Sequence, residues 1–251
     1  MTAHRRHLLA GVLGVLVTFL AWWAVTAAGL VNERILLGPA DLFERATRLN
    51  WGQMANHGAV SLYRVLMGFV AGGGLGILVG IITGWNRHAR RLLIGPLELL
   101  RPIPPLAWIP IALIWFGTGD MSKIFVIALG SFFVLMTNAD KGVRHLDPAL
   151  IRQARSYSLT GLSLVRRVVL PGIRPELVVG SSVGLSISFA SLVAAEMLGA
   201  DSGLGYLLMQ ARVDGDFGLV LLAIIAIAAL AYVTDIVVRR LVMRHSEAYE
   251  G

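Results

Sequence analysis

Five ionisable side chains stand in or beside long apolar runs, where a charge could bind a polar solute or line its path. They are Arg64, Glu98, Arg101, Glu196 and Asp235. A charge is costly in hydrocarbon, so each of them is a candidate for function. Glu98 can pair with Arg101 along one helix face, and Asp235 with Arg239. Glu196 has no such neighbour in "LVAAEMLGADSGLGYLL", which makes it the strongest candidate for a residue that lines a path or gate.

Motifs for bond-breaking chemistry are absent from the sequence. The chain has no cysteine, which excludes disulfides, thiolate metal sites and cysteine nucleophiles. It has no phosphate-binding P-loop, no H-E-x-x-H motif and no G-x-S-x-G motif, and its six histidines are scattered in loops or near the ends. We therefore expect no catalytic residue, no metal site and no cofactor in this chain.

The composition indicates the class of protein. Of the 251 residues 56% are hydrophobic and 15% are charged, whereas a soluble domain carries about a quarter charged residues. Long apolar runs account for the difference and predict an all-α integral membrane protein surrounded by lipid. The net charge of +7 is typical of the basic cytoplasmic loops of such proteins, so we expect no nucleic-acid partner.

Six segments are expected to be transmembrane helices because of their length and apolar character. They are Leu8–Leu30, Ala59–Gly84, Leu92–Phe116, Ile124–Asn138, Leu177–Leu198 and Phe217–Val238. The first is longer than the apolar region of about 7–15 residues in a cleaved signal peptide, so we expect it to be retained. The fourth is short, and we expect it to tilt little or to be extended by its flanks.

Lys and Arg are concentrated on the side of these spans that holds the N-terminus. The other side has only Arg34, Arg45, Arg48, Lys123 and Arg212, mixed with acidic residues. Because basic loops stay in the cytoplasm, this bias predicts six spans with both termini cytoplasmic.

The largest cytoplasmic loop, between the fourth and fifth spans, contains "IRQARSYSLTGLSLVRRVVLP". Asp147 as N-cap and Pro148 at the first helical position predict the start of a helix just before it. "SLTG" is typical of a turn, and "LSLVRRVVL" restarts a helix that Pro171 is expected to stop. The loop is therefore predicted to be a helix-turn-helix hairpin.

The first helix of this hairpin is predicted to be amphipathic. Leu150, Ala154 and Tyr157 share one face, whereas Arg152 and Arg155 lie elsewhere. One alternative is a solvated basic connector, but a connector needs neither a cap nor an apolar stripe. The hairpin is thus a candidate for binding a partner at the cytoplasmic surface.

Two apolar spans carry unusual backbone patterns. In the second span, glycines recur every fourth residue and leave a groove for a second helix, in ordinary packing or as a moving pair. They are Gly68, Gly72, Gly76, Gly80 and Gly84. In the third span, "LLRPIPPLAWIP" has four prolines that break the helix. Such a break suits a hinge or a path lining, or a segment that lies at the interface before crossing.

At the hairpin the sequence resembles the inner-membrane permease subunits of bacterial ATP-binding-cassette importers. Aligned on Leu170 and Pro171, the E-A-A positions of their loop motif fall on Arg152, Gln153 and Ala154, and the motif glycine falls on Ser158. "LLRPIPPLAWIPIALIWFGTGDMSKIF", "ARSYSLTGLSLVRRVVLPGIRPELVVG" and "LVAAEMLGADSGLGYLL" look like the taurine, alkanesulfonate and nitrate branch, from about residue 59 to residue 242.

The resemblance implies a type I importer permease fold with a cytoplasmic coupling hairpin between the fourth and fifth helices. Two ATPase subunits, which carry ATP and Mg²⁺, would bind the hairpin, and an extracytoplasmic solute-binding protein and a second permease copy, expected as a homodimer, would complete the importer. The coupling residues implied are Asp147, Leu150, Arg152, Gln153, Ala154, Arg155, Tyr157, Ser158, Gly161, Leu170 and Pro171. The chain would then divide into residues 1–58, a permease core of residues 59–242 with its coupling loop at about 141–171, and a cytoplasmic tail of residues 243–251.

The resemblance also implies a location and a class of solute. The chain would lie in the bacterial inner membrane and carry a small anion such as a sulfonate, taurine or nitrate. Trp108, Trp115, Phe116 and Glu196 are the candidates for its path. The alternatives are a self-contained channel or ion-coupled secondary transporter, for which the sequence has few intramembrane carboxylates, and a membrane enzyme, for which it has no catalytic constellation.

Overall fold

The computed structural model describes residues 3–31 and 37–244, and the regular structure of these residues is entirely helical. The elements are α1 (Ala3–Ala27), α2 (Pro39–Thr47), α3 (Trp51–Trp85), α4 (Arg87–Leu100), the 3₁₀ turn η1 (Pro105–Trp108), α5 (Ile109–Phe116), α6 (Asp120–His145), α7 (Pro148–Ser156), α8 (Gly161–Leu164), the π-helical turn η2 (Val165–Val169), α9 (Leu170–Gly172), α10 (Arg174–Gly199), α11 (Leu204–Val213) and α12 (Phe217–Arg244). The all-α prediction is confirmed for this part of the chain.

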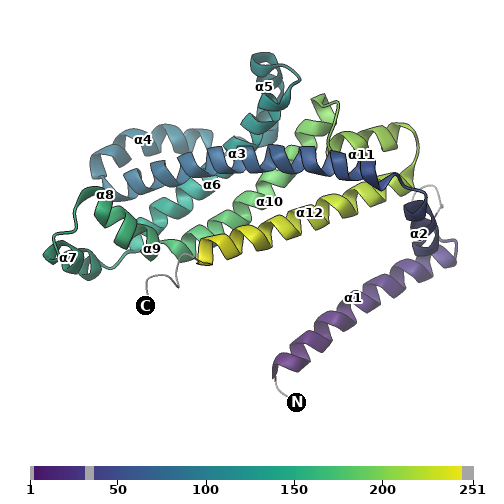
Figure 1. The fold of residues 1–251 in the computed structure, drawn as a ribbon, viewed down its shortest axis with the longest axis horizontal. Helices are drawn as coiled ribbons and strands as arrows, with labels where there is room; N and C mark the ends of the chain where they lie inside the picture. Colours follow the sequence, from purple (N-terminus) through teal and green to yellow (C-terminus); the bar gives the residue numbers. More distant parts are fainter. Residues whose placement is uncertain (1–2, 32–36, 245–251) are drawn as a thin grey trace.

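Four helices, α3, α6, α10 and α12, are each long and apolar enough to cross a membrane. They form the elongated bundle in Figure 1 and correspond to four of the six predicted spans. A fifth crossing results if α4 and the η1–α5 segment are taken as one bent span. The helix α1 covers most of the first predicted span, but its apolar part within the described residues is the shorter stretch Leu16–Ala27.

The glycine groove of α3 holds α6 at close range. A Cβ atom at Gly72 would lie 2.1 Å from the carbonyl oxygen of Ala128, and one at Gly80 would lie 2.4 Å from that of Met136. At Gly68, Gly76 and Gly84 a Cβ atom would likewise meet an atom of α6 within 2.7 Å. The backbones of α3 and α6 therefore pack closely along this groove, because no side chain larger than hydrogen fits between them.

The helix α3 begins earlier than the predicted second span. Asn50 caps it, since its Oδ1 accepts a hydrogen bond from the backbone N–H of Gln53 at 3.2 Å. The helix is continuous from there to Trp85, so the predicted division between residues 58 and 59 falls inside one rigid element.

The helix α6 also exceeds the predicted fourth span, which is extended by both flanks. Its C-terminal flank contains Asp140, a buried carboxylate that is not among the predicted functional residues. Arg90 of α4 and Arg144 of α6 donate to this carboxylate at 3.1 Å, and the hydroxyl of Thr83 donates at 3.0 Å. Because these partners satisfy the charge, the helix can continue through polar sequence.

The proline-rich third span is broken, as predicted. Residues 101–104 leave the helix, and the axes of α4 and the η1–α5 segment differ in direction by 84°. Pro104 and Pro105 supply no backbone N–H to continue the helix. None of the residues of α4 is buried, whereas α5 packs Ile109 and Ala112 against Val126 of α6 and Ala195 of α10. The break thus divides an exposed helix from one inserted among the spans.

Two short helices that lie outside the predicted spans, α2 and α11, cover the end of the bundle opposite α7 (Figure 1). Leu42 of α2, Leu204 and Leu207 of α11 and Leu222 of α12 share one buried cluster there. The helix α1 stands clear of the bundle in Figure 1 and is attached near its end, where the indole of Trp22 donates to the carbonyl oxygen of Leu37 at 3.1 Å.

Candidate functional site

The hairpin, residues 148–172, projects from one end of the bundle (Figure 1). Its first helix, α7, begins as predicted, because the carboxylate of Asp147 accepts the backbone N–H of Ala149 at 2.7 Å and Pro148 occupies the first position. The cap satisfies a backbone donor that would otherwise lack a partner at the helix start. The helical part of the hairpin is therefore specified by its local sequence.

The turn after α7 depends on an unusual backbone conformation at Ser158, which stands where the loop motif has glycine. Its φ angle is +60°, and no other non-glycine residue in the described part of the chain has a positive φ. The N–H groups of Ser158 and Leu159 bond to the carbonyl oxygens of Arg155 and Ala154, at 2.9 and 3.2 Å. This is a Schellman ending, a conformation in which glycine is the usual residue at the position with positive φ.

The second arm of the hairpin differs from the prediction at its end. Pro171 does not stop the helix, which continues through α9 to Gly172 before Ile173 separates it from α10. The reason is the π-helical turn η2, in which the N–H of Leu170 bonds to the carbonyl oxygen of Val165, five residues back. A wider helical turn just before a proline accommodates its missing N–H, so the helix continues without a break.

The predicted apolar stripe of α7 is divided between two faces. Ala154 is buried against the rest of the protein, whereas Leu150 and Tyr157 are 42% and 74% exposed. In the second arm, Leu162 is 71% exposed and Leu164 is buried. Arg152, Gln153, Arg155, Arg166 and Arg167 are exposed as well. The hairpin thus presents Leu150 of α7, Tyr157 at the end of that helix, Leu162 of α8 and four arginines to its surroundings.

The base of the hairpin is fixed to the bundle. Val169 and Ile173 are completely buried in a cluster with Ala139 and Val143 of α6 and Leu177 of α10. Displacing the hairpin would therefore pull on two spanning helices at once, because well-packed contacts transmit strain.

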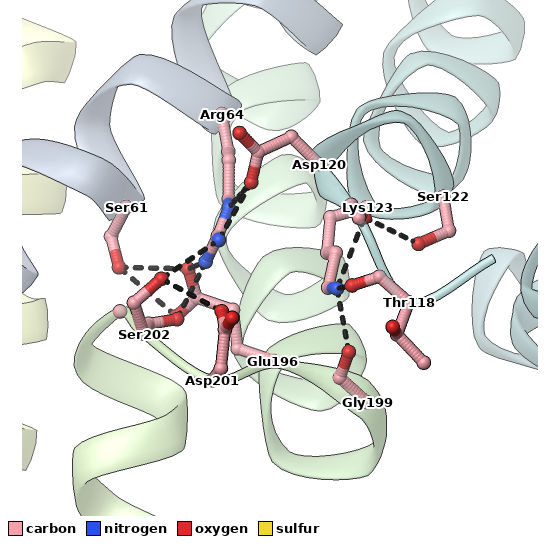
Figure 2. Close-up of polar contacts among 12 residues, drawn as sticks. Ser61, Arg64, Thr118, Asp120, Ser122, Lys123, Glu196, Gly199, Asp201 and Ser202 are labelled. Carbon is pink, nitrogen blue, oxygen red and sulfur yellow. Dashed lines mark hydrogen bonds and ion pairs between the residues drawn. The ribbon is translucent and has the colours of Figure 1, made fainter. Parts of the chain in front are cut away.

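Glu196 lies in a buried polar network rather than on an open path (Figure 2). Its carboxylate accepts hydrogen bonds from the guanidinium of Arg64 at 2.8 Å and from the hydroxyl of Ser61 at 2.9 and 3.0 Å. It also accepts one from the backbone N–H of Gly205 at 2.9 Å. Arg64 also donates to Asp120 at 2.8 Å. The network therefore joins α3, α6, α10 and α11.

Neighbouring contacts bind the chain between α10 and α11 to the same place. Arg64 donates to the carbonyl oxygen of Ser202 at 2.6 Å, and the backbone N–H of Gly203 donates to the Nδ1 atom of His57 at 3.0 Å. Lys123 donates to the carbonyl oxygens of Gly119 at 3.1 Å and Gly199 at 2.6 Å, and to that of Thr118 (Figure 2). These contacts provide a hydrogen-bond partner for the carbonyl oxygen of Gly199 at the end of α10. They also fix the position of residues 202 and 203, which connect α10 to α11.

The aromatic candidates for the path lie together on and beside α5. Trp115 and Phe116 are exposed and pack on Phe125 of α6, with ring centroids 5.9 and 5.3 Å away, and Trp108 is half-buried. No polar contact among the described residues joins them to Glu196. The four predicted path residues therefore form two separate groups in this structure.

Comparison with known proteins shows the family of this chain. Residues 74–246 match the family described as the inner membrane component of binding-protein-dependent transport systems. The chain belongs to this family. It is 33% identical over 247 residues to the putative aliphatic sulfonates transport permease protein of Bacillus subtilis, which covers 97% of this chain and 90% of that protein. It is 35% identical over 243 residues to the taurine transport system permease protein of Escherichia coli, covering 93% and 86%.

The fold of this permease is shared with a solved importer. A chain of the inward-facing MetNI methionine ABC transporter superposes with a TM-score of 0.55 at 23% identity, covering 79% of this chain and 96% of that one. The permease is therefore a transmembrane subunit of an ATP-binding-cassette importer, in the branch that includes the sulfonate and taurine permeases, and a multi-pass inner-membrane protein.

The other ionisable candidates of the permease have structural surroundings. Asp235 pairs with Arg239 at 2.8 Å, as predicted from their spacing. Glu98 and Arg101 are both exposed, and no ion pair among residues 3–31 and 37–244 joins them, so their predicted pairing is wrong. The bend that follows α4 explains this, since Arg101 lies where the helix ends and its side chain is free to leave the face of Glu98.

Metal-binding clusters of three or more His, Asp or Glu do not occur in the part of the permease that the structure describes. Asp140, Ser61 and His57 belong to buried polar groups that were not predicted from the sequence. Their positions in apolar helices give only a weak signal, because a Ser, a His or a single Asp is also common at helix ends and on exposed faces.

Proposed function

We propose that this permease imports small organic anions of the sulfonate class as a homodimer with two ATPase subunits, which contact its hairpin. The observation that carries the proposal is the hairpin itself, whose base is buried between two spans while its outer surface presents Leu150, Tyr157 and Leu162 among arginines. The family to which the chain belongs depends on a separate binding protein for its solute. Hydrolysis of ATP would occur in the partner subunits.

The exposed side chains of the hairpin suit a groove on a partner protein. An exposed aromatic ring is a frequent anchor at protein interfaces, and arginines at its rim can pair with acidic residues. ATP-driven movement of the partner would then move the hairpin and, through Val169 and Ile173, the ends of α6 and α10. Different contacts in the open and closed states of the ATPase would shift the permease between its own states.

Capture of the ATPase tests the role of the hairpin. The variant Tyr157→Ala is expected to lose most of the ATPase that copurifies with the wild-type permease, because it removes the most exposed aromatic ring of the hairpin. Tyr232→Ala is the matched control, since Tyr232 is 68% exposed on α12. Equal capture by both variants, each with a normal gel-filtration profile, would contradict the role of Tyr157.

The solute class rests on the relatives. The two permeases named above are described as transporting aliphatic sulfonates and taurine, and both are similar over nearly the whole chain. Reconstituted with its ATPase and binding protein, the complex is expected to accumulate labelled taurine or butanesulfonate in proteoliposomes only when ATP is present. Uptake of neither compound, with ATPase activity intact, would reject the solute class.

Six spans with both termini in the cytoplasm are part of the same proposal, supported by the bias of Lys and Arg. Since the chain has no cysteine, single thiols can be introduced without removing any. A membrane-impermeant maleimide is expected to label Thr47→Cys in intact spheroplasts and Ser156→Cys only after lysis. The reverse pattern would overturn the orientation.

A further inference from the structure

A cavity of about 380 Å³ lies between α6, α10 and the broken segment that joins α4 to η1. Seven of its lining residues come from one face of α6, namely Leu129, Gly130, Phe133, Val134, Thr137, Asn138 and Lys141. Val183 and Ile187 of α10, Arg101 and Ile103 of the break, and Pro105 of η1 complete the lining. The volume is within the range of small-molecule sites, about 300–1,000 Å³.

The face of α6 changes in character along the cavity. Its first four lining residues are apolar or glycine, Thr137 and Asn138 follow, and Lys141 ends the series. The broken segment contributes a second cation to the lining, Arg101. One wall can therefore bury an alkyl group while cationic and amide N–H groups meet a charged head group.

The charge of the cavity is unbalanced. Its lining contains Arg101 and Lys141 and no acidic residue. Among the described residues, no ion pair involves either of these side chains, in contrast to Arg64, Arg90 and Arg144, which are all paired. Asn138 uses one N–H in a bond to the carbonyl oxygen of Val134 at 2.8 Å, which leaves its second N–H to donate.

We propose that this cavity, which is open on one side, is a binding site for a small organic anion with an apolar tail, such as a short alkanesulfonate. Lys141 and Arg101 hold the head group, and Phe133, Val183 and Ile187 contact the tail. The proposal rests on the sulfonate import proposed above and deepens it, because it assigns to the permease a site for the solute after release from the binding protein.

Thiol labelling tests the site on the purified full-length permease in nanodiscs. The thiol of Thr137→Cys lines the cavity, and that of Thr47→Cys is the matched control beside the Glu44–Arg48 ion pair on α2. Each is treated with sulfonatoethyl and with trimethylammonioethyl methanethiosulfonate, which differ in charge. The preference for the anionic reagent is expected to be about tenfold greater at Thr137→Cys, the lower end of the enrichment in a cationic cleft.

Two further measurements make the assignment specific. Adding Arg101→Gln or Lys141→Gln should reduce the preference at Thr137→Cys, and 1-butanesulfonate should slow the labelling whereas 1-butanol should not. Equal preference at both positions, or labelling that 1-butanesulfonate does not slow, would overturn the site. Proteoliposome uptake tests the proposed function separately. If the sulfonate is taken up but does not slow the labelling of Thr137→Cys, only the cavity site is rejected. If the sulfonate slows the labelling but is not taken up, only sulfonate import is rejected.

Discussion

Ser158 shows how a single residue can depart from its motif without losing the turn. The left-handed conformation costs an L-amino acid free energy that glycine avoids, yet the two Schellman hydrogen bonds form. The small side chain of Ser158 is exposed to solvent. The departure therefore affects the stability of the turn and leaves its geometry unchanged.

The substitution Ser158→Gly is expected to stabilise the turn by about 0.5–1 kcal/mol, since glycine adopts positive φ freely. Amide hydrogen exchange at residues 154–159 should slow accordingly. The control is Ser156→Gly, two residues earlier in the right-handed helix, where the added backbone freedom should speed exchange. Faster exchange in Ser158→Gly would contradict the assignment of the strain.

Glu196 illustrates how much a buried charge depends on its partners. Its side chain is 0% exposed, and that of Arg64 is 3% exposed. Replacing one member of such a pair leaves the other without compensation in a medium that solvates it poorly. Asp120, which is 49% exposed, remains as a second partner of Arg64 and limits the loss.

The variant Glu196→Gln is expected to lower the free energy of unfolding by on the order of 3 kcal/mol, measured by chemical denaturation in detergent. Asp235→Asn, which removes the partner of Arg239, should cost less than about 1 kcal/mol, because the Arg239 side chain of this pair is 49% exposed to solvent. Similar losses in the two variants would argue against a special role of the buried network.

Between elements, the contact of α3 with α6 depends on backbone proximity. A Cβ at Gly72 would overlap backbone atoms of Ala128, which cannot rotate away as a side chain could. Gly74, on another face of the same helix, has no atom within 4 Å of its Cβ position. An alanine at either position removes the cost of a glycine in a helix, but only an alanine at Gly72 meets another helix. Comparing the two positions therefore isolates the effect of packing.

The variant Gly72→Ala is expected to destabilise the permease by about 1–3 kcal/mol, because the helices must move apart. Gly74→Ala should be neutral or stabilising by up to about 1 kcal/mol, since alanine favours the helix. Thermal unfolding in detergent measures both. A loss of stability in Gly74→Ala equal to that in Gly72→Ala would show that the clash is not the cause.

Considered as a whole, the molecule is held together at the end away from the hairpin by an ion pair between distant segments. Arg45 of α2 donates to the carboxylate of Asp216 at 3.0 Å, and Asp216 also accepts the N–H of Leu219 at the start of α12. The hydrogen bond from Arg45 lowers the pKa of the Asp216 carboxyl below its ordinary value of 3.8, although partial burial opposes this.

The sign of the resulting pH dependence follows from that shift. A carboxyl whose pKa is lower in the folded state stabilises the fold above its unfolded pKa, and the contribution is lost as the pH falls through the folded pKa. Wild type should therefore exceed Asp216→Asn in thermal stability at neutral pH by at most about 1 kcal/mol, because the pair is partly exposed. The difference should shrink as the pH falls below the ordinary carboxyl pKa and should disappear once the pH lies below the lowered pKa of Asp216 in the folded state. A difference that persists in acid would exclude this cause.

Several features of the permease follow from its sequence alone because their causes are local. Long apolar runs produce α3, α6, α10 and α12, since only a helix satisfies its own backbone in lipid. The start of α7 follows from Asp147 and Pro148, and the break after α4 from its prolines. Periodic glycines predict a close helix partner, although they do not say which helix it is.

Other features depend on where distant segments meet, and only the tertiary structure determines them. Glu196 is bonded to Arg64 and Ser61, which precede it by 132 and 135 residues, so no local pattern could reveal that it is satisfied. The same holds for the burial of Ala154 beside exposed Leu150 and Tyr157, and for the unpaired cations of the cavity. Helix formation is set by neighbours in the chain, whereas the environment of a side chain is set by the packing of whole helices.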